Sequence, residues 1–240
     1  MSWFINWFDS PYYHLLYKDR DEKEAKIFID NLVSYFQIPR KSTLLDVACG
    51  KGRHAIYFNT KGMNVFGIDL SKKSIQIAQK NNNKTLQFIV WDMRKVFKKN
   101  SFDIVTNLFT SFGYFEKNED EQQAINTMAL NLKSEGILII DFMNTKRVVE
   151  NLIKSEEKKV DGITFKIKRS VKKKYIIKDI AFSDNGRHFQ FKEKVRGLTL
   201  KDFSILISNA KLKIIDIFGN YKLEDFNALK SERLIIVCKK

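Results

Sequence analysis

A short segment of the sequence combines an aspartate with two glycines that stand one residue apart. Asp46, Ala48, Gly50 and Gly52 occupy alternate positions within residues 45–53. Glycines at this spacing let a backbone turn come close to a ligand, and the helix expected to follow offers free N–H groups to an anionic group. A carboxylate shortly before the first glycine suits a ligand that carries an ammonium or sulfonium charge. The segment therefore predicts a cofactor site.

The same glycines fit a second kind of ligand. Gly50, Gly52 and Ala55 also satisfy the G-x-G-x-x-G/A pattern of dinucleotide-binding folds, in which a pyrophosphate sits on the helix. Asp46 argues against this interpretation, because a carboxylate is poorly placed beside a pyrophosphate. A nicotinamide-dependent oxidoreductase, or a module that only binds a cofactor, stays the alternative.

The run Asp46-x-Ala48-x-Gly50-x-Gly52 resembles the first motif of the class I S-adenosylmethionine-dependent methyltransferases. Three further segments resemble the later motifs of this superfamily, in the same order and at the ends of successive predicted strands: residues 65–71, 91–93 and 102–112. The resemblance covers residues 41–142. It implies S-adenosylmethionine as the cofactor and S-adenosylhomocysteine as the product, and it places the chain in the small-molecule methyltransferase-like branch.

The resemblance also assigns cofactor contacts. It implies that Asp69 accepts hydrogen bonds from both ribose hydroxyls, and that Asp92 accepts one from the adenine amino group beside Met93. Asp69 could instead cap the helix expected to begin near Ser71, and Asp92 could be a solvated loop acid. The complete set of expected cofactor-binding residues is Asp46, Ala48, Gly50, Gly52, Asp69, Leu70, Asp92, Met93, Leu108, Tyr13 and Arg20.

Methyl transfer from a sulfonium is an in-line displacement, so the protein mainly has to align a nucleophile and exclude water. Such an enzyme needs no strong catalytic motif, and the catalytic base stays unassigned. Candidates for that role are Tyr13, His14, Tyr114 and His188. The residues expected to line the acceptor pocket come from the fourth-motif loop and from a predicted hairpin turn: Asn107, Phe109, Thr110, Phe112, Tyr114 and Arg187.

The formal net charge of +15 raises the question of a nucleic-acid substrate. Lysine supplies 34 of the 43 basic residues and arginine 9, an excess typical of AT-rich coding sequences, whereas phosphate recognition favours arginine. The Pro-Pro-aromatic and Pro-Cys motifs of base-modifying enzymes are also missing from the sequence. We therefore expect a small-molecule nitrogen or oxygen acceptor. The alternative is an RNA or protein methyltransferase that docks through basic residues of an insertion: Lys166, Lys168, Arg169, Lys172, Lys173 and Lys174.

The elements that must position these residues alternate between strands and helices from residue 41 onward. Strands are predicted at residues 43–48, 63–68, 86–90, 102–108 and 136–142. Helices are predicted at residues 54–60, 71–82 and 119–132. Buried strands separated by helices form a parallel sheet with right-handed crossovers.

The pattern changes after residue 144. Residues 163–171, 175–182 and 188–195 alternate apolar and polar side chains, with a hairpin turn at 184–186. A helix at 199–210 and strands at 213–218 and 233–238 then resume the α/β pattern. The expected fold is α/β, in a single methyltransferase domain over residues 1–240. It has a Rossmann-like seven-stranded sheet (residues 41–150 and 199–240), an N-terminal helical cap (1–40, with a helix at 21–36) and an inserted antiparallel β subdomain (155–198).

The two cysteines, Cys49 and Cys238, belong to no CxxC or Cys/His cluster, which predicts neither a disulfide framework nor a metal site. No apolar run has the length of a membrane span, and the aromatic N-terminal segment lacks the basic start of a signal peptide. We expect a cytoplasmic enzyme, monomeric or homodimeric, without a membrane partner.

Overall fold

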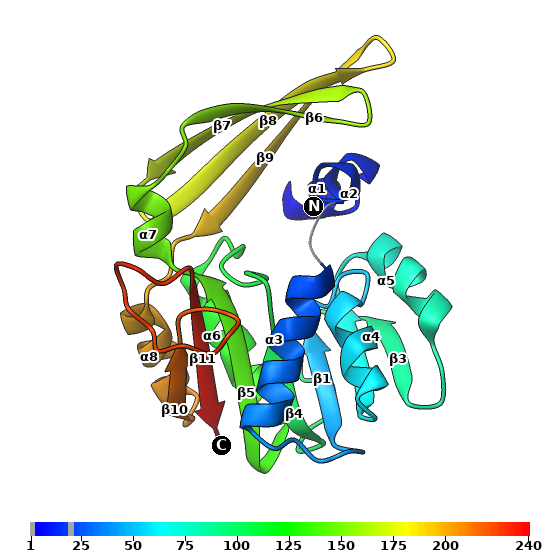
Figure 1. Cartoon of the computed structure of the whole chain (residues 1–240), viewed down its shortest axis with the longest axis vertical. Coiled ribbons are helices and arrows are strands. Elements are labelled where there is room, and N and C mark those ends of the chain that lie inside the picture. The colour runs from blue at the N-terminus through cyan, green and yellow to red at the C-terminus, as the bar shows by residue number, and fades with distance from the viewer. Residues whose placement is uncertain (1–2, 19–21) are drawn as a thin grey trace.

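The largest element of the computed structural model, which describes residues 3–18 and 22–240, is a seven-stranded sheet in the order β10-β11-β5-β4-β1-β2-β3 (Figure 1). Its strands are β1 (Thr43–Val47), β2 (Asn64–Asp69), β3 (Leu86–Val90), β4 (Phe102–Asn107), β5 (Leu132–Met143), β10 (Lys213–Phe218) and β11 (Arg233–Lys239). β1 to β5 pair in parallel, whereas β11 lies antiparallel between β5 and β10. The predicted α/β fold with a seven-stranded sheet is confirmed.

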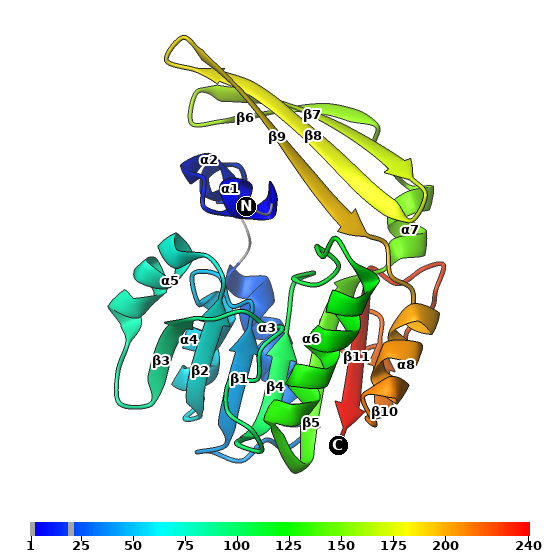
Figure 2. The same ribbon diagram turned by 180° about the vertical axis from the view of Figure 1, so that it is seen from behind.

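Helices cover both faces of this sheet (Figures 1 and 2). One face packs against α3 (Glu22–Tyr35), α4 (Arg53–Thr60) and α5 (Lys72–Ala78), and the other against α6 (Asn118–Asn131) and α8 (Leu200–Asn209). Central strands are consequently buried on both sides, as in the continuous apolar run from Leu234 to Cys238. Of the helices in the described residues, none is long and apolar enough to cross a membrane.

The helix predicted over residues 71–82 is shorter than expected. Ser71 is its N-cap, and its hydroxyl accepts a hydrogen bond from the backbone N–H of Ser74 at 3.0 Å. α5 ends at Ala78, and one 3₁₀ turn (η1, Gln79–Asn81) follows. Asparagine side chains compete for backbone hydrogen bonds, so the Asn81–Asn83 run ends the helix.

A four-stranded antiparallel sheet stands beyond the carboxyl ends of the core strands (Figure 1). Its strands are β6 (Ser155–Val160), β7 (Ile163–Lys172), β8 (Tyr175–Asp184) and β9 (Arg187–Arg196), and α7 (Thr145–Glu150) leads into it. The sequence predicted β7 to β9 but not β6. This edge strand reads Ser-Glu-Glu-Lys-Lys-Val, and charges on an edge hide the alternation by which strands are recognised.

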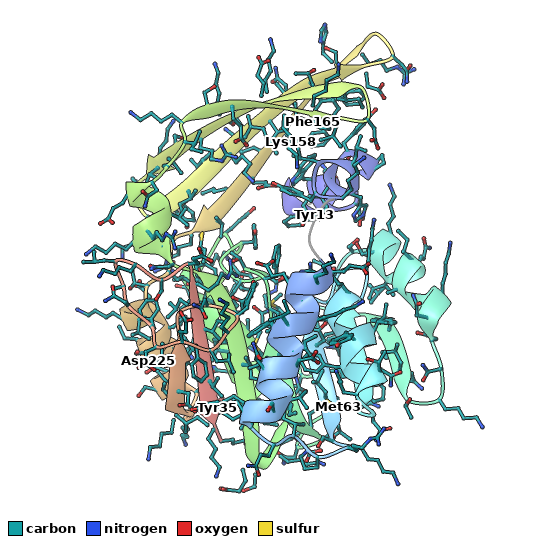
Figure 3. The ribbon with its side chains drawn as sticks, in the orientation of Figure 1. Tyr13, Tyr35, Met63, Lys158, Phe165 and Asp225 are labelled. Atoms are coloured by element: carbon teal, nitrogen blue, oxygen red, sulfur yellow. The ribbon has the colours of Figure 1, made fainter. Side chains whose placement is uncertain are left out.

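The N-terminal segment forms two short helices, α1 (Trp3–Phe8) and α2 (Pro11–Leu16), which the sequence did not predict. They pack against the four-stranded sheet, as Figure 3 shows for Phe165. Trp7, Leu16 and Phe165 are buried in this contact. We call α1, α2 and the sheet β6–β9 the roof. The N-terminal cap is therefore divided, because α3 packs on the core and α1 and α2 belong to the roof.

Candidate functional site

The turn from β1 into α4 has a backbone that few side chains tolerate. Ala48, Gly50 and Gly52 have φ angles of 59°, 56° and 84°. A Cβ on Gly52 would lie 2.4 Å from the ring of Phe88, so both its φ and its packing require glycine. A Cβ on Gly50 would meet nothing within 4 Å. The turn is thus closely packed against Phe88 at Gly52 and unobstructed at Gly50.

Asp69, at the end of β2, ties this turn to the next one. Its Oδ2 accepts a hydrogen bond from the N–H of Gly50 at 2.8 Å, and its Oδ1 accepts one from the N–H of Ser71 at 2.8 Å. Burial raises the pKa of the carboxyl, although these backbone donors oppose the rise. Because Ser71 is the N-cap of α5, Asp69 is not the cap, and each of its oxygens keeps a lone pair for a further donor.

Asp46, which the sequence placed among the cofactor-binding residues, lies beneath the turn and is not part of the cleft wall. It is 1% exposed in the middle of the sheet, and its Oδ1 accepts a hydrogen bond from the hydroxyl of Thr106 at 2.9 Å. Its buried Oδ2 has no hydrogen-bond partner among the described residues. Burial, together with the negative charge of Asp69, raises the pKa of Asp46 to about 7. A cationic ligand group above the turn would stabilise this carboxylate, which fits the expected cofactor.

Asp92, after β3, is held by Arg94. Its carboxylate accepts hydrogen bonds from the backbone N–H of Arg94 at 2.9 Å and from Nη2 of the same residue at 2.6 Å. Burial works toward a higher pKa, but the Arg94 hydrogen bonds hold the pKa of Asp92 below its usual range. Asp92, Met93 and Arg94 all line one cleft, so Asp92 is an ion-paired acid and not a solvated loop residue.

The loop after β4 contains two neighbouring residues in the left-handed region, since Phe109 and Thr110 both have a φ of 60°. Asp141 of β5 fixes this turn. Its Oδ2 accepts the N–H of Phe109 at 2.8 Å, and its backbone oxygen accepts the N–H of Thr110 at 2.9 Å. Arg233 donates to Oδ1 of Asp141 at 2.8 Å and to the hydroxyl of Thr110 at 3.0 Å. Tyr221 donates to Oδ2 of Asp141 at 3.0 Å.

Sequence reasoning missed this network of Asp141, Tyr221 and Arg233. A signal was available, because Asp141 interrupts the apolar run of β5 and Arg233 begins the apolar run of β11. A buried charge in a central strand requires a partner, and here the two charges meet across the β5–β11 pairing.

A cleft of about 1130 Å³ lies between the carboxyl ends of the core strands and the roof. It brings together most residues that the sequence assigned to the cofactor and acceptor: Tyr13, His14, Ala48, Asp69, Leu70, Asp92, Met93, Leu108, Phe109, Thr110 and Tyr114. Figure 3 shows Tyr13 on the side of the N-terminal helices that faces the core. Gly50 and Gly52 shape the floor of the cleft without lining it.

A second, smaller cavity of about 260 Å³ adjoins the cleft under the roof. Six residues line both spaces: Phe8, Tyr13, Tyr17, Phe109, Thr110 and Tyr114. The remaining wall comes from β5, α7, the loop after α7, the insertion and β11, with Met143, Val148, Leu152, Arg169, Ile176, Lys178, Glu193, Val195 and Arg233. The two spaces therefore share an aromatic boundary.

Four expected pocket or catalytic residues lie elsewhere. Phe112 is fully buried and packs against Phe203, because the loop turns back into the core. Asn107 is buried and donates from its amide to the backbone oxygen of Val47 at 3.0 Å. Arg187 and His188 are exposed at the hairpin end, since ten-residue strands carry that turn about 33 Å along the sheet. Arg20 lies outside the described residues.

The chain matches the family described as "Methyltransferase domain" over residues 38–193, which is more than half of its length. The putative methyltransferase YqeM of Bacillus subtilis is 32% identical over 116 residues, which cover 47% of each chain. A dTDP-3-amino-3,4,6-trideoxy-alpha-D-glucopyranose N,N-dimethyltransferase of Streptomyces venezuelae is 32% identical over 43% of each chain. The matches thus span about half the length of these curated relatives.

Solved structures agree with the fold over almost the whole chain. An S-adenosylmethionine-dependent methyltransferase of Clostridium acetobutylicum has a TM-score of 0.80 at 19% identity, with 95% of both chains covered. An amino pentose methyltransferase of Micromonospora echinaspora, solved with S-adenosylmethionine bound, has a TM-score of 0.72 at 20% identity and covers 96% of this chain and 97% of its own. This chain belongs to the methyltransferase domain family, and it has the fold of the class I S-adenosylmethionine-dependent methyltransferases.

Proposed function

We propose that this protein transfers a methyl group from S-adenosylmethionine to a nitrogen or oxygen atom of a small-molecule acceptor. The observation that carries the proposal is the single cleft in which the turn after β1, Asp69 and the Asp92–Met93 segment meet beneath a roof. A covered cleft suits a small acceptor, because a macromolecule would have to pass the roof. The family match sets aside the nicotinamide alternative.

Three of the expected cofactor contacts, Asp69, Asp92 and Met93, line this cleft, and Asp46 lies beneath it. Asp69 has the acceptor capacity for ribose hydroxyls, and Met93 offers an apolar surface for the adenine ring. Asp46 supplies the negative charge beneath the turn, where the ammonium and sulfonium groups would balance its buried carboxylate. Asp92 keeps its ion pair with Arg94 and can accept the adenine amino group with a remaining lone pair.

When bound, S-adenosylmethionine supplies an electrophilic methyl group that needs no further activation by the protein. The residues of this chain have to orient the acceptor and exclude water, which can lower the barrier by roughly 7 to 11 kcal/mol. Tyr13, His14 and Tyr114 line the cleft and remain candidates for a general base, whereas the position of His188 removes it.

The names of the relatives favour nitrogen as the methylated atom. They include N,N-dimethyltransferases of dTDP-amino sugars and glycine/sarcosine N-methyltransferases. Lys166 and Lys168 are exposed on β7 and keep RNA or protein as the competing acceptor class, whereas Arg169 lines the smaller cavity. Methyl-transfer assays with pooled small amines, with RNA and with protein would separate these classes, and transfer to RNA alone would contradict the small-molecule proposal.

The cofactor part is tested by isothermal titration of S-adenosylmethionine and S-adenosylhomocysteine into the purified protein. We expect micromolar binding that weakens tenfold or more in Asp69→Asn, because the variant loses the charge and one acceptor oxygen. Asp179→Asn, on the far face of β8, is the matched control and should bind like the wild type. Binding of NADH without any S-adenosyl signal would overturn the proposal.

A further inference from the structure

The smaller cavity under the roof has the position of an acceptor site. It shares the rings of Tyr13, Phe109 and Tyr114 with the cofactor cleft, so a molecule held in it can extend one end past these rings into the cleft. The chemistry of its wall can therefore indicate what the acceptor carries at its other end.

Three cationic side chains from three different strands reach this wall: Arg169 of β7, Lys178 of β8 and Arg233 of β11. All three are largely shielded from solvent, with side-chain exposures of 19%, 22% and 18%. Arg169 pairs with Glu156, and Arg233 pairs with Asp141. Neither of these carboxylates is among the described residues that line the cavity. Arg169 also donates to the backbone oxygen of Ile153 at 3.2 Å, and Arg233 donates to the hydroxyl of Thr110 at 3.0 Å. Because a guanidinium group has five N–H donors, each of the two keeps donors for a ligand.

One carboxylate, that of Glu193, does line the cavity, but its donors are already in place. Its Oε1 accepts hydrogen bonds from Nε1 of Trp7 at 2.6 Å and from the hydroxyl of Tyr17 at 2.7 Å. Its Oε2 lies 3.0 Å from Nζ of Lys178, which also donates to the Tyr17 hydroxyl at 2.5 Å. Glu193 thus fixes Lys178 between two strands of the roof. On the cavity wall itself stand three cations and one carboxylate, while Glu156 and Asp141 balance Arg169 and Arg233 from outside the wall.

We propose that this cavity binds an anionic group, a carboxylate or a phosphate, of the methyl acceptor. The inference rests on the proposed function and deepens it by naming the acceptor class. Arg169, Lys178 and Arg233 hold the anionic end, and the nucleophilic end points past Phe109 toward the cofactor cleft. In a space screened from water, charge-assisted hydrogen bonds to guanidinium groups are stronger than at a surface and fix the orientation of a ligand.

The rest of the wall suits a compact carbon skeleton beside that anion. Val148, Leu152 and Ile176 supply an apolar side, and aromatic rings supply the boundary with the cleft. The volume of about 260 Å³ admits a small acid or a monophosphate with one ring and excludes a polymer. The anion therefore belongs to the acceptor itself and not to a nucleic-acid backbone.

The test uses the whole protein saturated with S-adenosylhomocysteine, into which benzoate, phenyl phosphate and neutral benzyl alcohol are titrated in a calorimeter. We expect at least one anion to bind tenfold or more tightly than benzyl alcohol, and the stronger of the two identifies the anion class. Arg169→Gln should weaken that binding at least tenfold. Lys168→Gln, the next residue on β7 but on its exposed outer face, should leave it unchanged.

Lys178→Met is a second variant on another strand, which keeps the test decisive should Arg169→Gln unfold the roof. Equal binding of the neutral and anionic probes, or no detectable binding of either anion, would overturn the inference. Equal losses of anion affinity in Arg169→Gln and Lys168→Gln would also overturn the inference. The S-adenosylhomocysteine titration made beforehand on each sample separates the two proposals, because its failure contradicts the proposed function and its success leaves only the anion site in question.

Discussion

At the scale of single residues, the turns after β1 and β2 contain two carboxyl groups with different roles. Asp69 accepts backbone hydrogen bonds from both turns and so fixes their geometry. Asp46 shares one hydrogen bond with Thr106, and its second oxygen is buried without a protein partner in the described part of the chain. Asp69 is thus a structural support of both turns, whereas Asp46 is a buried carboxyl group whose ionised form a cationic ligand group would stabilise.

The charge state of Asp46 predicts a pH dependence of cofactor binding. Burial, and then the negative charge of Asp69, raise its pKa to about 7, while the hydroxyl of Thr106, the backbone N–H of Ala55 and the charge of Arg53 act in the opposite direction. The carboxyl is therefore mostly protonated at pH 6 and mostly ionised at pH 8. Because the ligand ammonium favours the ionised form, the affinity for S-adenosylhomocysteine should rise about tenfold between these pH values, with release of a proton.

Calorimetry in two buffers of different ionisation enthalpy measures both the affinity and the proton release. Asp46→Asn should bind more weakly at pH 8 and show an almost flat profile. A variant that keeps the wild-type pH slope would assign the titration to another group.

Replacing Gly52 with alanine should destabilise the protein through both its backbone conformation and its packing. A Cβ at this position meets the ring of Phe88 at 2.4 Å, and φ is 84°. Gly162 has the same φ of 84°, but a Cβ there meets nothing within 4 Å. Gly162→Ala should thus cost about 1–2 kcal/mol of unfolding free energy from backbone strain, and Gly52→Ala about 2–5 kcal/mol once overpacking is added. Urea denaturation compares the two, and equal losses would mean that Phe88 moves away freely.

At the scale of elements, the helices and strands that could be predicted are those with a regular pattern of apolar residues. Apolar strands between helices predicted β1 to β5, and the return of the α/β pattern after the insertion predicted the helix after Thr199. β6 was missed because its charges suit an exposed edge. The helices α1 and α2 were missed because six-residue aromatic segments carry no full amphipathic period, and their stability comes from packing on the roof.

The loop after β4 illustrates why part of the site could not be predicted. The sequence predicted Phe109, Phe112 and Tyr114 together in the acceptor pocket, whereas in the structure Phe109 and Tyr114 line the cleft and Phe112 is buried in the core. Which of three neighbouring aromatic residues faces the cleft depends on the left-handed turn at Phe109 and Thr110, and that turn depends on Asp141 of another strand. Such a long-range cause leaves no local signal in the loop.

The ion pair between Asp141 and Arg233 should therefore support both the loop and the fold. Asp141→Asn removes the charge that balances Arg233, whose side chain is 18% exposed, and we expect a loss of about 3–5 kcal/mol. The comparison is Glu135→Gln, which breaks the exposed pair with Lys239 at the other end of β11 and should cost less than about 1 kcal/mol. Denaturant unfolding measures both. Similarly small losses of unfolding free energy in both variants would mean that the Asp141–Arg233 pair does not support the loop.

At the scale of the whole molecule, the roof joins two parts of the chain that are far apart in sequence. Trp7 packs against Phe191 and donates to Glu193, and Tyr12 donates to Asp184 at 2.8 Å. The sequence predicted the core, the insertion and their order. It did not predict that the N-terminal helices pair with the insertion, because nothing in either segment specifies its distant partner before both are folded. The location in the cytoplasm likewise stays a prediction.

This arrangement predicts that the roof opens as one unit. Trp7 is 1% exposed and lies at its centre, so Trp7→Ala leaves a cavity between α1 and β9 that the core does not share. Hydrogen exchange followed by mass spectrometry should then become faster in residues 3–16 and in β7 to β9 together, while β1 and β4 keep their protection. Ile27→Ala, at a residue of α3 that is 52% exposed, is the control and should leave both regions unchanged.

Faster exchange in α1 and α2 alone would show that the helices leave the sheet by themselves, and a uniform increase would show that roof and core unfold together. Joint opening of α1, α2 and the sheet would widen the smaller cavity and the cleft at once, which is the movement that the acceptor site proposed above would require.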